Sequence, residues 1–164
     1  MTEKEERFMG AARENDDLHG YFIEDLSVGM TASYAKTITE TDIVIFAGIS
    51  GDNNPLHLNE EFARDSIFKG RIAHGMLTAV FISTVLGTKL PGPGCIYLNQ
   101  DVKFLAPVRP GETVNTQVTI SEVDLEKCRA VATSVCMVAG KPVVEGVSTL
   151  LVPSRARRKD RRAA

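Results

Sequence analysis

A run of fourteen residues without a charged side chain constrains the fold more than any other part of this chain. Residues 75–88 contain no Asp, Glu, Lys or Arg. Their apolar members fall on every side of a helix, which predicts a helix buried all round; these are Met76, Leu77, Ala79, Val80, Phe81, Ile82, Val85 and Leu86. The run is too short to span a bilayer, and Gly87 and Pro91 predict where the helix stops. Other elements must therefore cover it.

Segments with strand character are the natural cover for such a helix. They are rich in Val, Ile and Thr and lie at residues 30–38, 95–105, 112–124, 127–139 and 143–152. Within one of them Val114, Thr116, Val118 and Ile120 alternate with polar residues, as in half-buried antiparallel strands. We therefore predict an α+β fold, in which a five-stranded antiparallel sheet wraps around the long central helix.

Length and charge predict one domain with two polar ends. A chain of 164 residues with 43% hydrophobic content is typical of one globular domain. We expect the folded domain at residues 21–153, a loosely packed segment at 1–20 in which His19 is solvated, and a basic disordered tail at 154–164. Outside that tail the chain is acidic, which argues against nucleic-acid binding.

The cysteines and the N-terminus indicate a cytoplasmic protein without a membrane partner. Cys95, Cys128 and Cys136 form no Cys-x-x-Cys motif, and their odd number argues against a disulfide framework. Cys128 and Cys136 are expected on one side of a strand as core residues. The N-terminus lacks a signal-peptide apolar stretch. Neither the cysteines nor the histidines show the spacing of a metal site, so we expect no metal.

Two helices are predicted around a polar loop. Thr39 with Asp42 three residues later starts a helix over residues 40–49, and Asn59 is expected to cap a second, short helix. Between them, Gly51 and the sequence Asp52-Asn53-Asn54-Pro55 predict a tight loop that runs to His57. A turn there would bring Asp52 and His57 to one water or substrate atom, where a carboxylate and an imidazole can exchange protons. The alternative is an ordinary turn with a loop histidine.

The predicted start of the central helix offers a second chemical group. Ala73-His74-Gly75 contains no Ser, Thr, Asp or Asn to cap the first backbone N–H groups. With the helix dipole behind them, these donors suit an oxygen that gains negative charge, such as a thioester carbonyl becoming an enolate. Gly75, which lacks a Cβ, allows a close approach.

These motifs resemble the signature of the MaoC-like, (R)-specific enoyl-CoA hydratases. The matching residues are Ser50-Gly51-Asp52-Asn53-Asn54-Pro55-Leu56-His57 and His74-Gly75, and a wider similarity spans roughly residues 20–152. The resemblance implies a hotdog fold, a homodimer, and an active site in which Asp52 and His57 bind and activate water. It also implies that the Gly75 N–H helps to hold the thioester oxygen.

From the residues and the resemblance together we expect a hydro-lyase that reversibly hydrates trans-2-enoyl-CoA to (3R)-3-hydroxyacyl-CoA. The expected catalytic residues are Asp52, His57 and Gly75, and the candidate substrate-binding residues are Asn54, Phe68, Arg71, Ile72 and His74. No cofactor is expected, because CoA enters as part of the substrate. The alternatives are an acyl-CoA thioesterase on the same fold and a non-catalytic module that binds acyl-CoA or an acyl-carrier protein.

Overall fold

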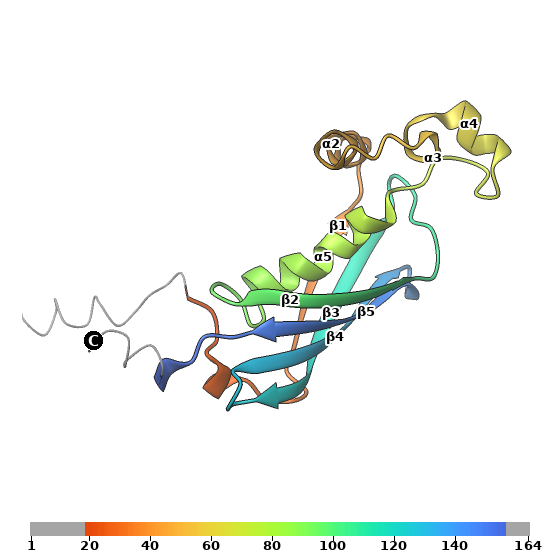
Figure 1. Cartoon of the computed structure of the whole chain (residues 1–164). Helices are drawn as coiled ribbons and strands as arrows, with labels where there is room; N and C mark the ends of the chain where they lie inside the picture. The colour runs from red at the N-terminus through yellow and green to blue at the C-terminus, as the bar shows by residue number, and fades with distance from the viewer. Residues whose placement is uncertain (1–18, 157–164) are drawn as a thin grey trace, which may run out of the picture.

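The computed structural model describes residues 19–156, which form one antiparallel sheet and a set of helices (Figure 1). The strands pair in the order β1-β3-β4-β5-β2, so the five predicted strands are confirmed. The strands are β1 (Thr31–Thr37), β2 (Ile96–Phe104), β3 (Thr113–Asp124), β4 (Arg129–Val138) and β5 (Lys141–Leu151). The helices are η1 (Ile23–Asp25), α2 (Glu40–Ser50), α3 (Pro55–Leu58), α4 (Glu60–Asp65) and α5 (Gly75–Thr88).

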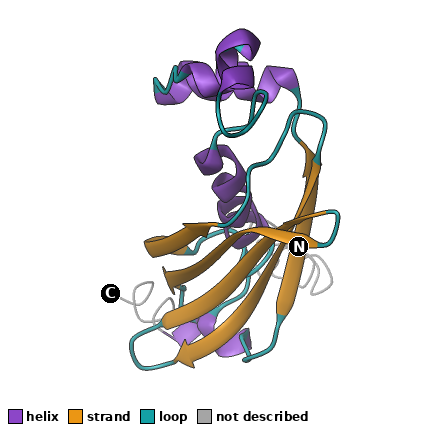
Figure 2. Cartoon of the chain, turned by 90° about the vertical axis from the view of Figure 1, so that its right-hand side faces the viewer, coloured by secondary structure: helices purple, strands orange, loops and turns teal. Residues whose placement is uncertain are grey.

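The central helix α5 lies along one face of the sheet and contacts β1, β2, β3 and β4 (Figure 2). The side toward the sheet is fully buried at Ile82 and Val85. The expectation of a helix buried all round is wrong, because Met76 is 55% exposed and Val80 43%. The sheet covers only one side of α5, and within the described residues nothing covers the other.

The strand alternation matches the sequence pattern. Thr116, Val118 and Ile120 of β3 are fully buried on the face toward the helix. Cys136 in β4 is buried, as expected, and so is Cys128. Cys128, however, precedes β4 and adopts a positive φ of 54°, so the two cysteines do not share one strand.

The segment from α2 to α4 connects β1 to α5 and lies beyond one end of the sheet (Figure 1). Thr39 and Asp42 form the predicted capping box at the start of α2. Hydrogen bonds from the Thr39 backbone N–H and then its hydroxyl lower the pKa of Asp42. Asn59 caps α4 by accepting a hydrogen bond from the Phe62 N–H, as predicted.

At the opposite end of the molecule, η1 is bonded to the last described residues. Glu24 accepts hydrogen bonds from Ser154 Oγ and from the Arg155 N–H, and Arg155 pairs with Asp25 at 2.8 Å. Burial raises the pKa of Glu24, but these hydrogen bonds outweigh it and lower the pKa to about 2. The expected tail boundary is therefore too early, because residues 154–156 belong to the folded body; residues 157–164 lie outside the described part.

The folded domain also begins earlier than the expected residue 21. The Gly20 N–H donates to the Pro93 carbonyl, and His19 stacks on Phe22 with ring centroids 4.2 Å apart. The prediction that His19 is solvated is therefore wrong, because its ring is partly buried against this aromatic neighbour. The remainder of the predicted loose segment, residues 1–18, lies outside the described residues.

No helix among residues 19–156 has both the length and the apolar character needed to cross a membrane.

Candidate active site

Asp52 lies in the loop that follows α2. That helix ends at Gly51, which adopts the left-handed conformation with φ 76°, and its N–H donates to the Ala47 carbonyl. The loop is then tied locally: the Asp52 N–H donates to Ser50 Oγ at 3.2 Å, and Asp52 Oδ1 accepts from the Asn54 N–H at 3.2 Å. The Asp52 residue stays exposed, so its carboxylate is available to a ligand.

His57 is not the loop residue that the sequence predicted. Asn54 accepts a hydrogen bond from the Leu56 N–H and Pro55 follows at the first position, so the chain begins the short helix α3, which carries a buried His57. Its Nδ1 lies 2.9 Å from the Ile72 carbonyl oxygen. Because a carbonyl only accepts, Nδ1 carries the proton and Nε2 is the nitrogen left for proton exchange.

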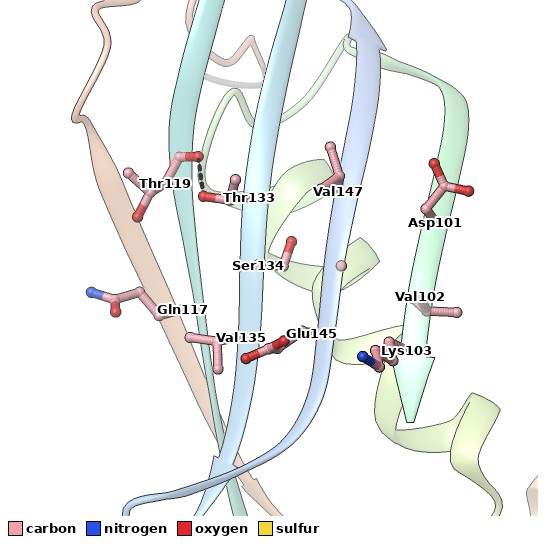
Figure 3. A pocket seen from close by; sticks show the side chains of 11 residues that line it. Asp101, Val102, Lys103, Gln117, Thr119, Thr133, Ser134, Val135, Glu145 and Val147 are labelled. Carbon is pink, nitrogen blue, oxygen red and sulfur yellow. Dashed lines mark hydrogen bonds between the residues drawn. The ribbon is translucent and has the colours of Figure 1, made fainter. Parts of the chain in front are cut away.

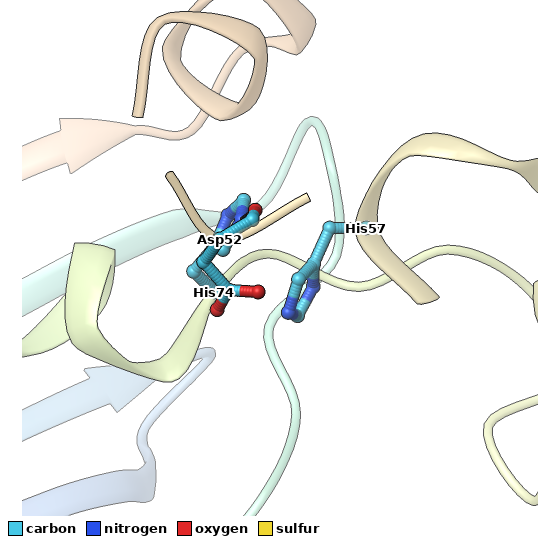
Figure 4. A group of neighbouring side chains, drawn as sticks. All are labelled: Asp52, His57 and His74. Atoms are coloured by element: carbon cyan, nitrogen blue, oxygen red, sulfur yellow. Dashed lines mark hydrogen bonds between the residues drawn. The ribbon is translucent and has the colours of Figure 1, made fainter. Parts of the chain in front are cut away.

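The loop and α3 bring the predicted pair together beside a third side chain. One ligand atom each from Asp52, His57 and His74 lies within 4.8 Å of the others (Figure 4). The His57 and His74 rings are 3.8 Å apart between centroids. All three residue types also bind metals, and the absence of a metal from this site stays a prediction.

The start of α5 is uncapped, as expected. His74 is the N-cap residue, and its side chain makes no capping hydrogen bond. A backbone N–H at this end, with the helix dipole behind it, is well suited to an oxygen that becomes negative.

The reason for a glycine at position 75 differs from the one expected. A Cβ at Gly75 would lie 2.9 Å from two carbon atoms of the Phe104 ring. The close approach that the glycine permits is therefore made by an aromatic side chain of β2, in addition to any ligand. Sequence reasoning missed Phe104, because the contact joins segments far apart in the chain.

An apolar cavity of about 250 Å³ adjoins Gly75. Two of the predicted substrate-binding residues, Phe68 and Ile72, line it together with Thr78 and Phe104. Its remaining walls come from Ala73, from residues 105–108 after β2 and from Val144. The cavity thus places apolar walls beside the helix start.

A larger hollow of about 550 Å³ lies across the other face of the sheet (Figure 3). Outward-facing side chains of four strands line it, among them Lys103, Gln117, Thr133 and Glu145. None of the predicted site residues contributes to it, so the chemistry predicted from the sequence does not belong there.

Arg71 is engaged by carboxylates of two helices. Its guanidinium lies 2.7 Å from Glu40 of α2 and 3.2 Å from Glu60 of α4, and the hydrogen bonds that it donates to Glu40 are the main cause of its raised pKa. Arg71 is therefore held by two ion pairs, and its role in substrate binding stays a prediction. Asn54 caps α3, and its role in substrate binding likewise stays a prediction.

The fold and the site together define a class of protein. A five-stranded antiparallel sheet along a central helix is the hotdog fold, and this one carries an aspartate and a histidine beside the uncapped start of that helix. The MaoC like domain family matches residues 27–147, and the chain belongs to this family.

Individual relatives agree with this assignment. An (R)-specific enoyl-CoA hydratase of Rhodospirillum rubrum is 55% identical over 85% of this chain and 97% of its own length. A 3-hydroxybutyryl-CoA dehydratase of Methylorubrum extorquens is 45% identical over 85% of this chain and 88% of its own. The solved structure of R-hydratase PhaJ1 from Pseudomonas aeruginosa is 39% identical, covers 83% of this chain and 88% of its own, and superimposes with a TM-score of 0.78.

Proposed function

We propose that this protein is a hydro-lyase that reversibly adds water to trans-2-enoyl-CoA to give (3R)-3-hydroxyacyl-CoA. The observation that carries the proposal is the convergence of Asp52 and His57 next to the start of α5. Two relatives with high identity bear the names (R)-specific enoyl-CoA hydratase and 3-hydroxybutyryl-CoA dehydratase, which support the same reaction in its two directions.

In this proposal Asp52 accepts a proton from water as the water oxygen attacks the β carbon. His57 enters the reaction as the imidazolium: its Nδ1–H donates to the Ile72 carbonyl, and its Nε2–H orients the water and then delivers its proton to the α carbon. Asp52 ends with one additional proton and His57 with one fewer. Because the two groups are neighbours, transfer of that proton from Asp52 to His57 restores the starting state.

The electrons of the carbon–carbon double bond move to the thioester oxygen during attack and return when the α carbon is protonated. The Gly75 N–H at the start of α5 stabilises this enolate oxygen, because it is a fixed donor backed by the helix dipole. A side chain capping α5 would compete for its first N–H donors, and His74 makes no such bond.

The apolar cavity beside Gly75 supports an acyl group as the occupant next to the thioester. Phe68 and Ile72 are the predicted residues in its wall, and about 250 Å³ is at the small end of ligand pockets. We assign the cavity to the acyl chain and propose Asn54 and Arg71 for contacts near the CoA part. No cofactor is needed, because proton transfer and a backbone donor suffice for the reaction.

The exposed apolar surface supports a homodimer. Met76 and Val80 are exposed on α5, and Leu98 and Phe104 are exposed on β2, which is an edge strand of the sheet. Apolar side chains beside an open strand edge are suited to burial against a second copy. Three free cysteines, two of them buried, are in keeping with a cytoplasmic homodimer. The acidic charge outside the basic tail argues against a nucleic-acid partner, and we propose no membrane partner.

The test is the reaction of the purified protein with crotonyl-CoA, with loss of the enoyl absorbance and release of free thiol recorded in parallel. The proposal predicts loss of absorbance without thiol, and chiral analysis should give the (3R) product. Thiol release would identify a thioesterase instead. Tight binding without reaction, on crotonyl-CoA and on longer enoyl-CoA thioesters, would identify a binding module.

A further inference from the structure

His74 is buried at the junction of three elements of the site. Its side chain is only 1% exposed although it is an imidazole at the start of a helix. The ring lies 5.0 Å from the Phe46 ring of α2 and 3.8 Å from the His57 ring of α3, between centroids. A polar ring in such a place is expected to have a specific hydrogen bond.

That hydrogen bond goes to the main chain of the catalytic loop. His74 Nε2 lies 3.0 Å from the Asp52 carbonyl oxygen. Because the oxygen only accepts, Nε2 carries a proton, and in the neutral ring the lone pair is then on Nδ1. Nδ1 is buried and has no hydrogen-bond partner among the described residues.

The other hydrogen bonds of the Asp52 loop are local. The Asp52 N–H donates to Ser50, the Asn53 N–H to the Gly51 carbonyl and the Asn54 N–H to Asp52. Among the hydrogen bonds that the described structure shows for residues 51–53, the one from His74 is the only one that connects this loop to the start of α5. It therefore sets the place of Asp52 relative to the residue that follows His74, which is Gly75.

We propose that His74 is a positioning residue, whose Nε2–H fixes the Asp52 loop against the start of α5 and so holds the Asp52 carboxylate in register with the Gly75 N–H. The proposal rests on the function proposed above and replaces the sequence-based expectation that His74 binds substrate. A hydrogen bond from one helix end thus couples the proton-accepting group to the oxygen-binding group.

Two substitutions distinguish the role of Nε2 from that of Nδ1 in the His74 ring. In His74→Gln the side-chain amide nitrogen is placed like Nε2 and can still donate to the Asp52 carbonyl. In His74→Asn the shorter amide is placed like Nδ1 and does not reach that oxygen. We expect His74→Asn to lower kcat by roughly tenfold to a hundredfold with KM little changed, because a misplacement of about 1 Å has this effect. His74→Gln should stay within about threefold of wild type.

A double-mutant cycle then shows whether His74 acts through Asp52. In the Asp52→Asn background the loop has no carboxylate left to position, so adding His74→Asn should change kcat by less than about threefold. The proposal would be overturned if the losses in kcat of the two single variants multiplied in the double variant, or if His74→Gln were as slow as His74→Asn. If His74→Gln were slow and His74→Asn active, the positioning role would belong to Nδ1 and the proposal would also be wrong.

A measurement on the wild-type protein keeps the proposal testable if a variant fails to fold. In protein labelled with ¹⁵N histidine, NMR should show His74 with a protonated Nε2 and an unprotonated Nδ1. The opposite tautomer contradicts the proposal. If the wild type hydrates no enoyl thioester, the proposed function fails, whereas the tautomer result still decides whether His74 donates to the loop.

Discussion

The sheet end and the site end of this molecule are stabilised in different ways. At the sheet end, the paired strands and α5 pack against each other and fully bury Ile82 of α5 and Val114 and Ile120 of β3. The segment from α2 to α4 leaves Val44 and Ile49 exposed, and α3 and α4 have only four and six residues. Helices this short are not stable by themselves. Substitutions at the sheet end should therefore change stability, whereas those at the site should change turnover.

The largest effect on stability is expected at the sheet end. Ile82→Ala removes a fully buried side chain from the face of α5 that packs on the sheet. Truncation of this kind typically costs about 2–5 kcal/mol of unfolding free energy. Urea unfolding measures the loss, and kcat of the folded fraction should be unchanged. A fall in kcat without a loss of stability would break the distinction between the two ends.

A smaller effect is expected where the two ends meet. Gly75→Ala places a Cβ at 2.9 Å from the Phe104 ring, which must shift. Such overpacking typically costs about 1–3 kcal/mol, and it should also slow turnover because Gly75 carries the proposed oxygen-binding N–H.

The matched control for Gly75→Ala is the double variant with Phe104→Ala, which removes the ring. Stability measured by urea unfolding should show a smaller penalty for Gly75→Ala in this background than in the wild type. Equal penalties in the two backgrounds would mean that Phe104 is not the reason for a glycine here.

The smallest effect is expected where Glu24 accepts hydrogen bonds from Ser154 and Arg155. The pKa of Glu24 lies at about 2, below its ordinary value of 4.5, so its contribution is present above about pH 4.5 and is lost as the pH falls toward 2. Glu24→Gln should therefore lower the melting temperature most at neutral pH. The difference from wild type should shrink as the pH falls below 4.5.

Glu61→Gln is the control for the acid series, because the side chain of Glu61 in α4 is exposed and makes no hydrogen bond or ion pair with the described residues. It should leave the melting temperature unchanged at every pH. A Glu24→Gln difference that stays constant with pH would mean that the hydrogen bonds from Ser154 and Arg155 do not lower the pKa of this carboxylate.

The sequence was most informative where local chemistry decides the structure. Strand alternation, the capping box at Thr39, the Asn59 cap and the uncapped start at Gly75 all follow from residues next to each other in the chain. The Asp52 and His57 pair was recognised because both residues belong to one short motif.

Contacts between distant segments escaped the sequence analysis. The Phe104 ring over Gly75, the Arg71 pairing with two helices and the stacking of His19 on Phe22 depend on how elements meet in space. The exposed side of α5 was also missed, because an apolar pattern does not distinguish burial inside one chain from a surface open to a partner.

The central claim is that Asp52, held beside the start of α5, is the acid/base group of a hydration reaction. The most direct test is kcat for crotonyl-CoA hydration by Asp52→Asn, with Asn53→Ala, a change at the adjacent exposed residue, as the control. We predict a fall of at least roughly a hundredfold for Asp52→Asn at an unchanged melting temperature, and near-normal turnover for the control. An Asp52→Asn protein that melts normally and still hydrates crotonyl-CoA at close to the wild-type rate would contradict the account.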